Sequence, residues 1–258
     1  MTAPVEYRVL GVVEVSVGGR WLSLNGKQRS LLALLLLRAN ERVSVSGIVE
    51  ALWGDRPPAS PATRVRTLVS ELRTKLRYAP PNTLVTRPAG YTLRVTDGQL
   101  DLDRFSSLVE QARRSSAALR LDRAISEYDA AMGLWRGAAL GGVSGGLLEA
   151  EAAGLGELRL RTFEERCEVL MASGRHSDAI LQLGSLAAEC PLREQVHALL
   201  MTAYYRAGYR REALDVYQTL RENLVSELGL EPMQSLRTLQ QRILTGSLDP
   251  QPPRNRAG

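Results

Sequence analysis

The chain has 258 residues, of which 44% are hydrophobic and 24% are charged, a composition typical of globular proteins and long enough for two domains. Its longest apolar run, Leu31 to Leu37, is far shorter than the roughly 20 residues of a membrane span. The N-terminus has no basic, apolar signal sequence, and Cys167 and Cys190 follow no metal or redox spacing. The sequence therefore predicts a cytoplasmic protein that has no association with the membrane.

The charge is distributed unevenly along the chain. Residues 1–96 carry 14 Lys and Arg against 6 Asp and Glu, a balance of +8. Residues 97–258 carry 19 Lys and Arg against 22 Asp and Glu, a balance of −3. A basic part beside a mildly acidic one favours a polyanionic partner for the first part alone, although chance bias on a solvated surface would look similar.

The first elements alternate like β-structure. Apolar residues at period two predict strands over residues 7–9, 13–17 and 21–24, and Gly18-Gly19 supplies the positive φ angles of a tight hairpin. Asn25-Gly26 then ends this sheet.

Three helices follow the sheet. Residues 27–39 form a helix that is apolar almost all round and so belongs at the centre of a domain. Residues 45–53 form a short helix, with Ser44 as its N-cap. Residues 62–77 form a third helix, with a buried stripe at helical spacing. That stripe consists of Val65, Leu68, Val69, Leu72 and Leu76.

Two strands over residues 84–87 and 91–95, joined through Pro88-Ala89-Gly90, make a hairpin after the third helix. A sheet, three helices and a hairpin are the order of a winged helix-turn-helix, and we predict this domain over residues 1–96.

The third helix carries short hydroxyls and arginines opposite its apolar stripe, which suits the major groove of DNA. Arg66 and Arg73 are the best candidates for guanine contacts. Glu71 could accept from a cytosine amino group or pair with Lys75 one turn later, and both readings stay open. The predicted base-contacting residues are Arg66, Thr67, Ser70, Glu71, Arg73 and Thr74.

Other basic residues suit the DNA backbone or the minor groove. Arg87 lies at the hairpin tip, where a wing meets the minor groove. Lys27 and Arg29 lie at the start of the first helix, where free backbone N–H groups also favour phosphate. Arg64 and Arg77 flank the third helix's outer face. For Lys27 a solvated charge remains the alternative.

From Asp101 onward the pattern is helical, with one glycine-rich interruption at residues 137–146. Between residues 170 and 220 several positions repeat at an interval of 34, which is the tetratricopeptide period. The repeating pairs are Gly174 and Gly208, Ala179 and Ala213, and Leu186 and Leu220. We predict an all-α tetratricopeptide-like domain over residues 101–245 and a disordered tail over residues 247–258.

No motif indicates catalysis, a cofactor or a metal. His176 and His197 lie within the repeats, away from any nucleophile or ligand pattern, and the paired glycines at 141–142 and 145–146 lack the Lys-Ser/Thr of a phosphate loop. We therefore predict a protein that is not an enzyme and needs no cofactor.

Ordered sequence blocks over residues 5 to about 245 resemble the Streptomyces antibiotic regulatory protein family. They are 26–33 (GKQRSLLA), 35–40 (LLLRAN), 51–55 (ALWGD), 69–73 (VSELR), 86–91 (TRPAGY), 101–105 (DLDRF), 134–137 (LWRG), 191–194 (PLRE) and 227–232 (ELGLEP).

The resemblance implies a mainly α protein with a small β component, consisting of an OmpR-type winged helix and a tetratricopeptide-like bacterial transcriptional activation domain. It implies an activator of secondary-metabolite genes that binds direct repeats near the −35 region as a dimer or paired protomers. Its partners would be double-stranded promoter DNA and RNA polymerase holoenzyme. The family's wing maps onto residues 86–91, which adds Thr86 and Tyr91 to the predicted contacts. Many members have a basic residue at the position of Glu71, so the base preference there does not transfer.

Two alternatives remain. The same DNA binding would also serve a repressor, because blocking and recruiting use one surface. A tetratricopeptide adaptor, with the winged helix as a protein-docking fold, would bind a peptide instead of DNA.

Overall fold

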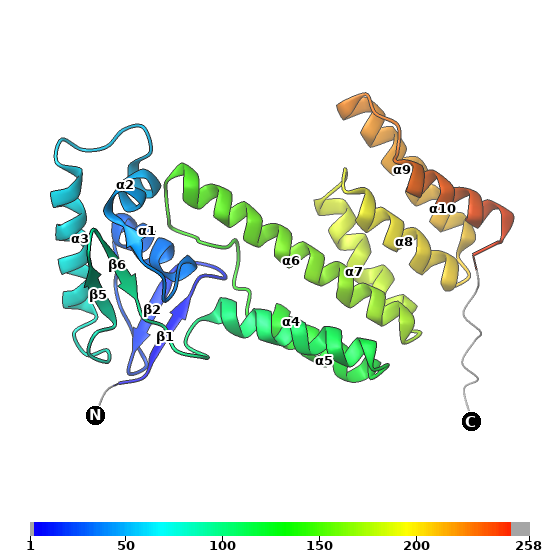
Figure 1. The fold of residues 1–258 in the computed structure, drawn as a ribbon. Coiled ribbons are helices and arrows are strands. Elements are labelled where there is room, and N and C mark those ends of the chain that lie inside the picture. Colours follow the sequence, from blue (N-terminus) through cyan, green and yellow to red (C-terminus); the bar gives the residue numbers. More distant parts are fainter. Residues whose placement is uncertain (1–2, 249–258) are drawn as a thin grey trace. The chain divides into compact units, whose positions relative to one another are not determined.

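The computed structural model describes residues 3–248, which form two compact units (Figure 1). Of the described residues, the first unit contains 3–111 and 129–160. The second contains 112–128 and 161–248. The predicted boundary between residues 96 and 101 falls inside the first unit, so the sequence modules and the compact units are different divisions of the chain. The positions 96 and 101 stay predictions of module limits.

The first unit begins with a three-stranded antiparallel sheet in the order β1-β2-β3. Its strands are β1 (Val5–Arg8), β2 (Glu14–Val17) and β3 (Arg20–Trp21). Gly18 and Gly19 have φ angles of 60° and 79°, which is the left-handed backbone that the β2–β3 turn requires. The predicted hairpin is thus confirmed.

The three predicted helices are present. They are α1 (Gly26–Leu37), α2 (Val45–Trp53) and α3 (Pro61–Lys75). Residues 31–36 of α1 are all buried, as expected of a helix that is apolar on every side. Ser44 caps α2 by accepting a hydrogen bond from the backbone N–H of Gly47 at 3.1 Å.

The stripe of α3 is buried against the other helices, and Leu72, its deepest member with Val65, is fully shielded from solvent. Burial of a leucine side chain stabilises a fold by about 1.5–3 kcal/mol. The five apolar side chains of this stripe therefore hold α3 in one rotational setting about its axis.

A second sheet, in the order β4-β6-β5, combines a strand that precedes α2 with the hairpin that follows α3. The hairpin strands β5 (Leu84–Arg87) and β6 (Gly90–Leu93) confirm the prediction, and β4 (Val43–Ser44) adds a strand that periodicity did not indicate, because two residues show no period. A Cβ at Gly90 would overlap the carbonyl of Val43, so the pairing of β4 with β6 needs glycine at this position.

The glycine-rich segment after α5 (Leu121–Met132) packs on the first sheet's edge. The N–H of Leu140 donates to the carbonyl of Val9 at 2.9 Å, and the N–H of Val13 donates to the carbonyl of Gly141 at 3.0 Å. An interruption between helices in the sequence is therefore a structural part of the first unit.

The remaining elements are helices. They are α4 (Asp101–Ala117), α6 (Gly146–Ala172), α7 (His176–Glu189), α8 (Glu194–Arg206), α9 (Arg210–Leu228) and α10 (Gln234–Thr245). The 34-residue repeat is visible in the structure: Gly174 and Gly208 make the turns before α7 and α9. Ala179 and Ala213 are fully buried at equivalent places in those two helices.

The predicted tail begins at residue 247, but Leu248 is buried in the apolar cluster of α8, α9 and α10. The first two residues of the predicted tail therefore lie within the described structure, and the disorder of the tail stays a prediction. Residues 249–258 lie outside the described residues.

Within residues 3–248, none of the helices is both long and apolar enough to cross a membrane. In the same described range, His, Cys, Asp and Glu side chains do not gather into a group of three or more that could ligate a metal.

The buried carboxylate of Asp101 joins α4 to the first sheet, which leads to a prediction about stability. It accepts from the N–H groups of Val9 (2.9 Å) and Leu10 (3.2 Å), and Arg136 pairs with it at 2.7 Å. Asp101→Ala leaves two buried donors and a cation without their acceptor. We expect the free energy of unfolding, measured in urea, to fall by about 3 kcal/mol.

Asp103→Ala is the matched control on the same helical turn. Burial, with the nearby carboxylates of Asp97 and Asp101, raises the pKa of Asp103, so its ionised form does not stabilise the fold. Its removal should change the free energy of unfolding by less than about 0.5 kcal/mol. Equal effects of the two substitutions would contradict the role of Asp101.

Candidate nucleic-acid interface

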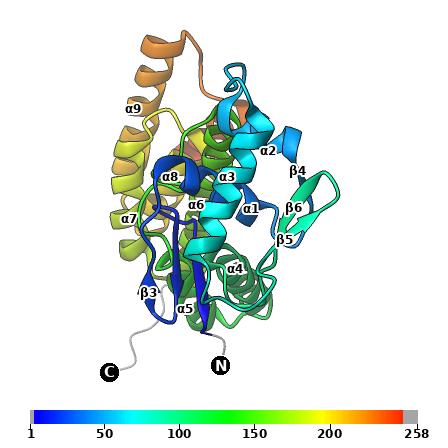
Figure 2. The same cartoon turned by 90° about the vertical axis from the view of Figure 1, so that its left-hand side faces the viewer.

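The outer face of α3 is exposed and lies at the front of the first unit in Figure 2, next to the β5–β6 hairpin. Because the apolar stripe faces inward, the polar residues of the helix must face solvent. The exposed predicted residues on α3 and just after it are Arg64, Arg66, Thr67, Ser70, Arg73, Thr74 and Arg77. The structure thus brings together seven side chains that the sequence assigned to DNA.

Two threonine hydroxyls among these residues donate to the helix backbone. Thr67 Oγ1 donates to the carbonyl of Thr63 at 3.1 Å, and Thr74 Oγ1 donates to the carbonyl of Ser70 at 3.0 Å. A hydroxyl that uses its only proton in this way presents lone pairs outward. In this setting Thr67 and Thr74 are acceptors, which suits the amino groups of adenine and cytosine.

Arg73 ties α3 to the hairpin. Its Nε donates to the carbonyl of Leu84 at 3.1 Å, and a terminal nitrogen donates to Thr86 Oγ1 at 2.8 Å. Its guanidinium carbon also lies 5.9 Å from the centre of the Tyr91 ring, which pairs across the strands with Thr86. Tyr91, which the sequence assigned to DNA, is only 7% exposed, so its ring packs inside the protein next to Arg73.

Glu71 is half-buried and faces the start of α1. Its Oε2 accepts from Nε2 of Gln28 at 2.8 Å, while no ion pair joins Glu71 to Lys75 in the described chain. The geometry therefore supports neither sequence reading of Glu71 in the free protein. Gln28 is the residue that sequence reasoning missed.

Gln28 was detectable from the spacing Asn25-x-x-Gln28, which is that of a capping box. Asn25 Oδ1 accepts from the N–H of Gln28 at 2.9 Å, and Gln28 Oε1 accepts from the N–H of Asn25 at 3.1 Å. The hydrogen bonds that link Asn25, Gln28 and Glu71 therefore fix the start of α1 against α3.

Lys27 and Arg29 are half-buried at the same helix start. Lys27 Nζ donates to the carbonyl of Leu52 at 2.5 Å and lies 5.6 Å from the centre of the Trp53 ring, so it stabilises the end of α2. An ammonium group has three donors, and two remain for phosphate. The Nε of Arg29 is buried and has no hydrogen-bond partner in the described structure.

The hairpin tip carries a second arginine beside the predicted Arg87. Arg42 is exposed and donates to the carbonyl of Pro88 at 3.0 Å. Arg42 and Pro88 are 46 positions apart, so no local pattern could indicate this contact. The tip therefore offers two cations to an anionic partner.

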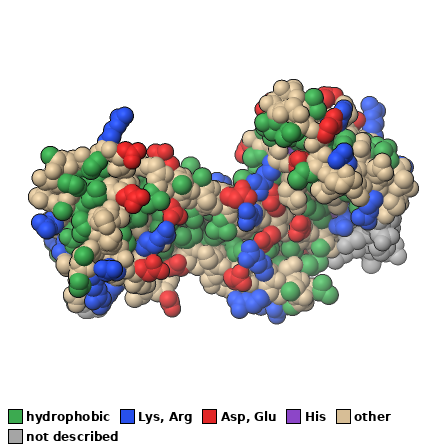
Figure 3. All heavy atoms as spheres, turned by 45° about the horizontal axis from the view of Figure 1, so that its top comes forward, with side chains coloured by type: hydrophobic (Ala, Val, Ile, Leu, Met, Phe, Trp, Pro, Cys, Tyr) green, Lys and Arg blue, Asp and Glu red, His purple; other side chains and the backbone are tan. Residues whose placement is uncertain are grey.

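The helical second unit carries charge of both signs. On the face drawn in Figure 3, Lys and Arg are interspersed with Asp and Glu over the helices, and many are paired. A surface with alternating charges does not attract a polyanion strongly. Among the described residues, the exposed row of hydroxyls and arginines on α3 and the neighbouring hairpin tip both belong to the first unit.

Two known families match successive parts of the chain. Residues 19–93 match the family "Transcriptional regulatory protein, C terminal", and residues 100–244 match the "Bacterial transcriptional activator domain". The chain belongs to the Streptomyces antibiotic regulatory protein family. Members of this family are transcription regulators, and activation is part of the family's description.

Similar proteins are regulators from actinomycetes. The chain is 39% identical to the regulatory protein AfsR of Streptomyces coelicolor over 93% of its own length, and 37% identical to the transcriptional regulatory protein MoaR1 of Mycobacterium tuberculosis over 93%. It is 35% identical to the regulatory protein DnrI of Streptomyces peucetius over 84% of its length. The chain spans 24% of AfsR, 79% of MoaR1 and 84% of DnrI.

A solved structure has the same fold. Mycobacterium tuberculosis EmbR, determined in complex with a low-affinity phosphopeptide, matches 95% of this chain with a TM-score of 0.89 and 31% identity. The match covers 66% of the EmbR chain. The winged helix and the tetratricopeptide-like helices predicted from the sequence are thereby confirmed as the fold class.

The contact of Arg73 with the hairpin leads to a second prediction. In a double-mutant cycle, Arg73→Ala and Thr86→Val should show a coupling free energy of about 0.5–1 kcal/mol in urea unfolding, because each removes the same hydrogen bond.

Arg66→Ala combined with Thr86→Val is the control, since the structure records no contact between these side chains within residues 3–248. Those two effects should add to within about 0.5 kcal/mol. If the effects of the first pair also add, the hydrogen bond between Arg73 and Thr86 does not stabilise the hairpin.

Proposed function

We propose that the chain binds promoter DNA through α3 and the β5–β6 hairpin and activates transcription of secondary-metabolite biosynthetic genes. The observation that carries this proposal is the exposed row of hydroxyls and arginines on α3, next to a hairpin with two arginines at its tip. Family membership supports the regulatory role. A repressor would use the same DNA-binding surface. The choice of activation over repression is therefore supported only by the chain's membership of a family of activators.

In this proposal α3 lies in the major groove and reads bases through Arg66, Thr67, Ser70, Arg73 and Thr74. The hairpin tip, with Arg87 and Arg42, contacts the adjacent minor groove. Lys27, Arg29, Arg64, Arg77 and Thr86 lie near enough to these elements to contact phosphates. Glu71 and Tyr91 act indirectly, since Glu71 orients α3 through Gln28 and Tyr91 lies under the guanidinium of Arg73.

On a promoter, paired protomers would occupy direct repeats near the −35 region and recruit RNA polymerase holoenzyme. The resemblance to the family is the support for this arrangement. Footprinting of the promoters beside the chain's own gene would measure the repeat spacing, and transcription in vitro with purified holoenzyme would give the sign. A footprint with a single half-site would contradict the paired arrangement, and lower transcript yield would make the protein a repressor.

The proposal predicts strongly salt-dependent binding to DNA. Each phosphate contact releases condensed counterions, so log K should fall by about 0.9 per contact for each unit of log salt concentration. A mobility-shift titration between 50 and 200 mM salt, with promoter and scrambled duplexes, measures both the slope and the specificity. A flat slope would indicate a protein-docking adaptor, while equal affinity for both duplexes would remove the claim of specificity.

Two neighbouring arginines on α3 separate base reading from phosphate binding. Arg66→Ala should cost about 1–3 kcal/mol of binding free energy and relax the preference at one base pair. Arg64→Ala, two positions earlier and on the opposite flank of the exposed side of α3, should weaken all sequences alike and lower the salt slope by about one. Binding to a library of single-base variants checks both. The division of roles fails if the two substitutions give the same profile.

A further inference from the structure

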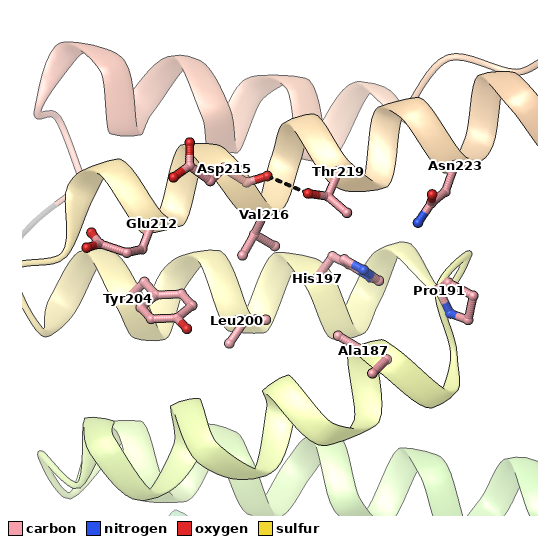
Figure 4. Close-up of a pocket in the computed structure, with 11 residues that line it drawn as sticks. Ala187, Pro191, His197, Leu200, Tyr204, Glu212, Asp215, Val216, Thr219 and Asn223 are labelled. Carbon is pink, nitrogen blue, oxygen red and sulfur yellow. Dashed lines mark hydrogen bonds between the residues drawn. The ribbon is translucent and has the colours of Figure 1, made fainter.

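The second unit contains a groove over α8, between the end of α7 and α9, with a volume of about 430 Å³ (Figure 4). Residues of the α7–α8 connection close one end of it. The residues lining it are Ala187, Ala188, Pro191, His197, Leu200, Tyr204, Glu212, Asp215, Val216, Thr219 and Asn223. All of them belong to the second unit, so the groove is separate from the DNA-binding proposal.

The centre of the groove is apolar. Leu200 of α8, Val216 of α9 and Ala187 of α7 approach from three helices, and none of the three carries a polar side-chain atom. Leu200 is only 5% exposed, while Val216 and Ala187 are partly buried, so these two offer most of the apolar surface that a partner would cover. Covering such surface is favourable by about 25 cal/mol per Å².

The polar side chains around this centre are mainly hydrogen-bond acceptors. Nδ1 of His197 lies 3.0 Å from the carbonyl of Arg193 and must donate to it, so in the neutral ring Nε2 is an acceptor. Thr219 Oγ1 donates to the carbonyl of Asp215 at 3.0 Å, as the dashed line in Figure 4 marks, and its lone pairs remain free. The carboxylates of Glu212 and Asp215 accept only. A partner that supplies several hydrogen-bond donors would complement these acceptors.

One end of the groove combines acidic and aromatic side chains. Figure 4 shows Tyr204 and Glu212 together at the end opposite Pro191 and Asn223. The ring of Tyr204 meets that of Tyr209 edge to face, with 6.4 Å between the ring centres. A tyrosine face beside a carboxylate is a favourable place for a guanidinium or ammonium group.

No lysine or arginine is among the lining residues. The nearest described ion pair on this side, Arg211 with Asp215, has a separation of 3.8 Å, and both side chains are largely exposed. A pair of this kind contributes at most about 1 kcal/mol, so an incoming cation can replace Arg211 at little cost.

We propose that this groove binds a segment of a partner protein that carries an arginine or lysine beside apolar residues. The cation pairs with Glu212 and Asp215 against the ring of Tyr204, and the apolar residues cover Leu200, Val216 and Ala187. A protein segment fits better than a small molecule because the groove is open to solvent along its length. Small-molecule sites usually bury 70–90% or more of a drug-sized ligand.

The test uses the full chain without DNA, so that its outcome is independent of the DNA-binding proposal. The probe is a fluorescein-labelled peptide of alternating leucine and arginine, compared with the same peptide containing citrulline or glutamate in place of arginine. Fluorescence anisotropy should show at least tenfold tighter binding of the arginine peptide than of the citrulline peptide, and no binding of the glutamate peptide.

Two variants place the binding in the groove. Glu212→Gln with Asp215→Asn should weaken the arginine peptide at least fivefold. Thr219→Arg, which puts a cation into the groove, should abolish binding. The matched controls on α9 are Glu227→Gln and Gln218→Arg, both exposed and outside the lining, and they should bind as the unaltered chain does. Circular dichroism checks that each variant is folded.

Several results would overturn the proposal. Equal affinity for the arginine and citrulline peptides would remove the role of the carboxylates. A groove variant that binds like its control would place the peptide elsewhere. If Thr219→Arg converts a dimer into a monomer in sedimentation, a second copy occupies the groove. If removal of residues 249–258 raises peptide affinity more than fivefold, the chain's own C-terminal residues occupy it instead of a partner.

Discussion

The burial of one stripe of α3 determines which of its side chains face outward. The helix turns by 100° per residue, so once five apolar side chains pack on α1 and α2, the opposite face is fixed to within a few tens of degrees. Burial of Leu68 and Leu72 alone contributes several kcal/mol, by the scale of about 1.5–3 kcal/mol for each such side chain. No hydrogen bond on the exposed face competes with this, since each contributes about 1 kcal/mol. The apolar stripe therefore selects the outer row, and the contacts of Arg73 and Glu71 only adjust it.

Those weaker contacts fix the position of the exposed side chains of α3 relative to the hairpin and to α1. Arg73 joins α3 to the hairpin, and Glu71 joins it to the capping box of α1 through Gln28. The hairpin is joined in turn to the connection before α2, through β4 and through Arg42 at the tip. The proposed binding of DNA through both α3 and the hairpin requires such ties, because an error in the spacing of helix and hairpin would misplace one of the two contacts.

The sequence predicted the elements that depend on local pattern and failed where a contact joins distant segments. The stripe of α3, the cap of α2 by Ser44 and the 34-residue repeat all follow from spacing within one window, and each is confirmed. The sequence left Glu71 with two readings, a cytosine amino group or Lys75 in its own helix, yet its partner in the structure is Gln28, 43 positions away. The glycine-rich segment was predicted as an interruption between helices, but its backbone bonds to the first sheet from a distance of more than a hundred residues. A contact between two residues that are far apart in the chain produces no periodic pattern, so it cannot be predicted from a single sequence.

The ties of Arg73 and Lys27 in the free protein do not conflict with a role on DNA, and magnitudes show why. A guanidinium has five N–H donors, of which the hairpin uses two, and an ammonium has three, of which the end of α2 uses one. An exposed hydrogen bond contributes about 0.5–1.5 kcal/mol, whereas a bidentate contact with guanine discriminates by about 1–3 kcal/mol. Arg73 therefore gains little or nothing by leaving the hairpin for a poorly placed base, and gains clearly only at a well-placed guanine. Arg66 has no such competing contact in the described structure. If α3 reads bases as we propose, Arg66 would meet no such threshold, so Arg66 would contribute more to affinity and Arg73 more to selectivity.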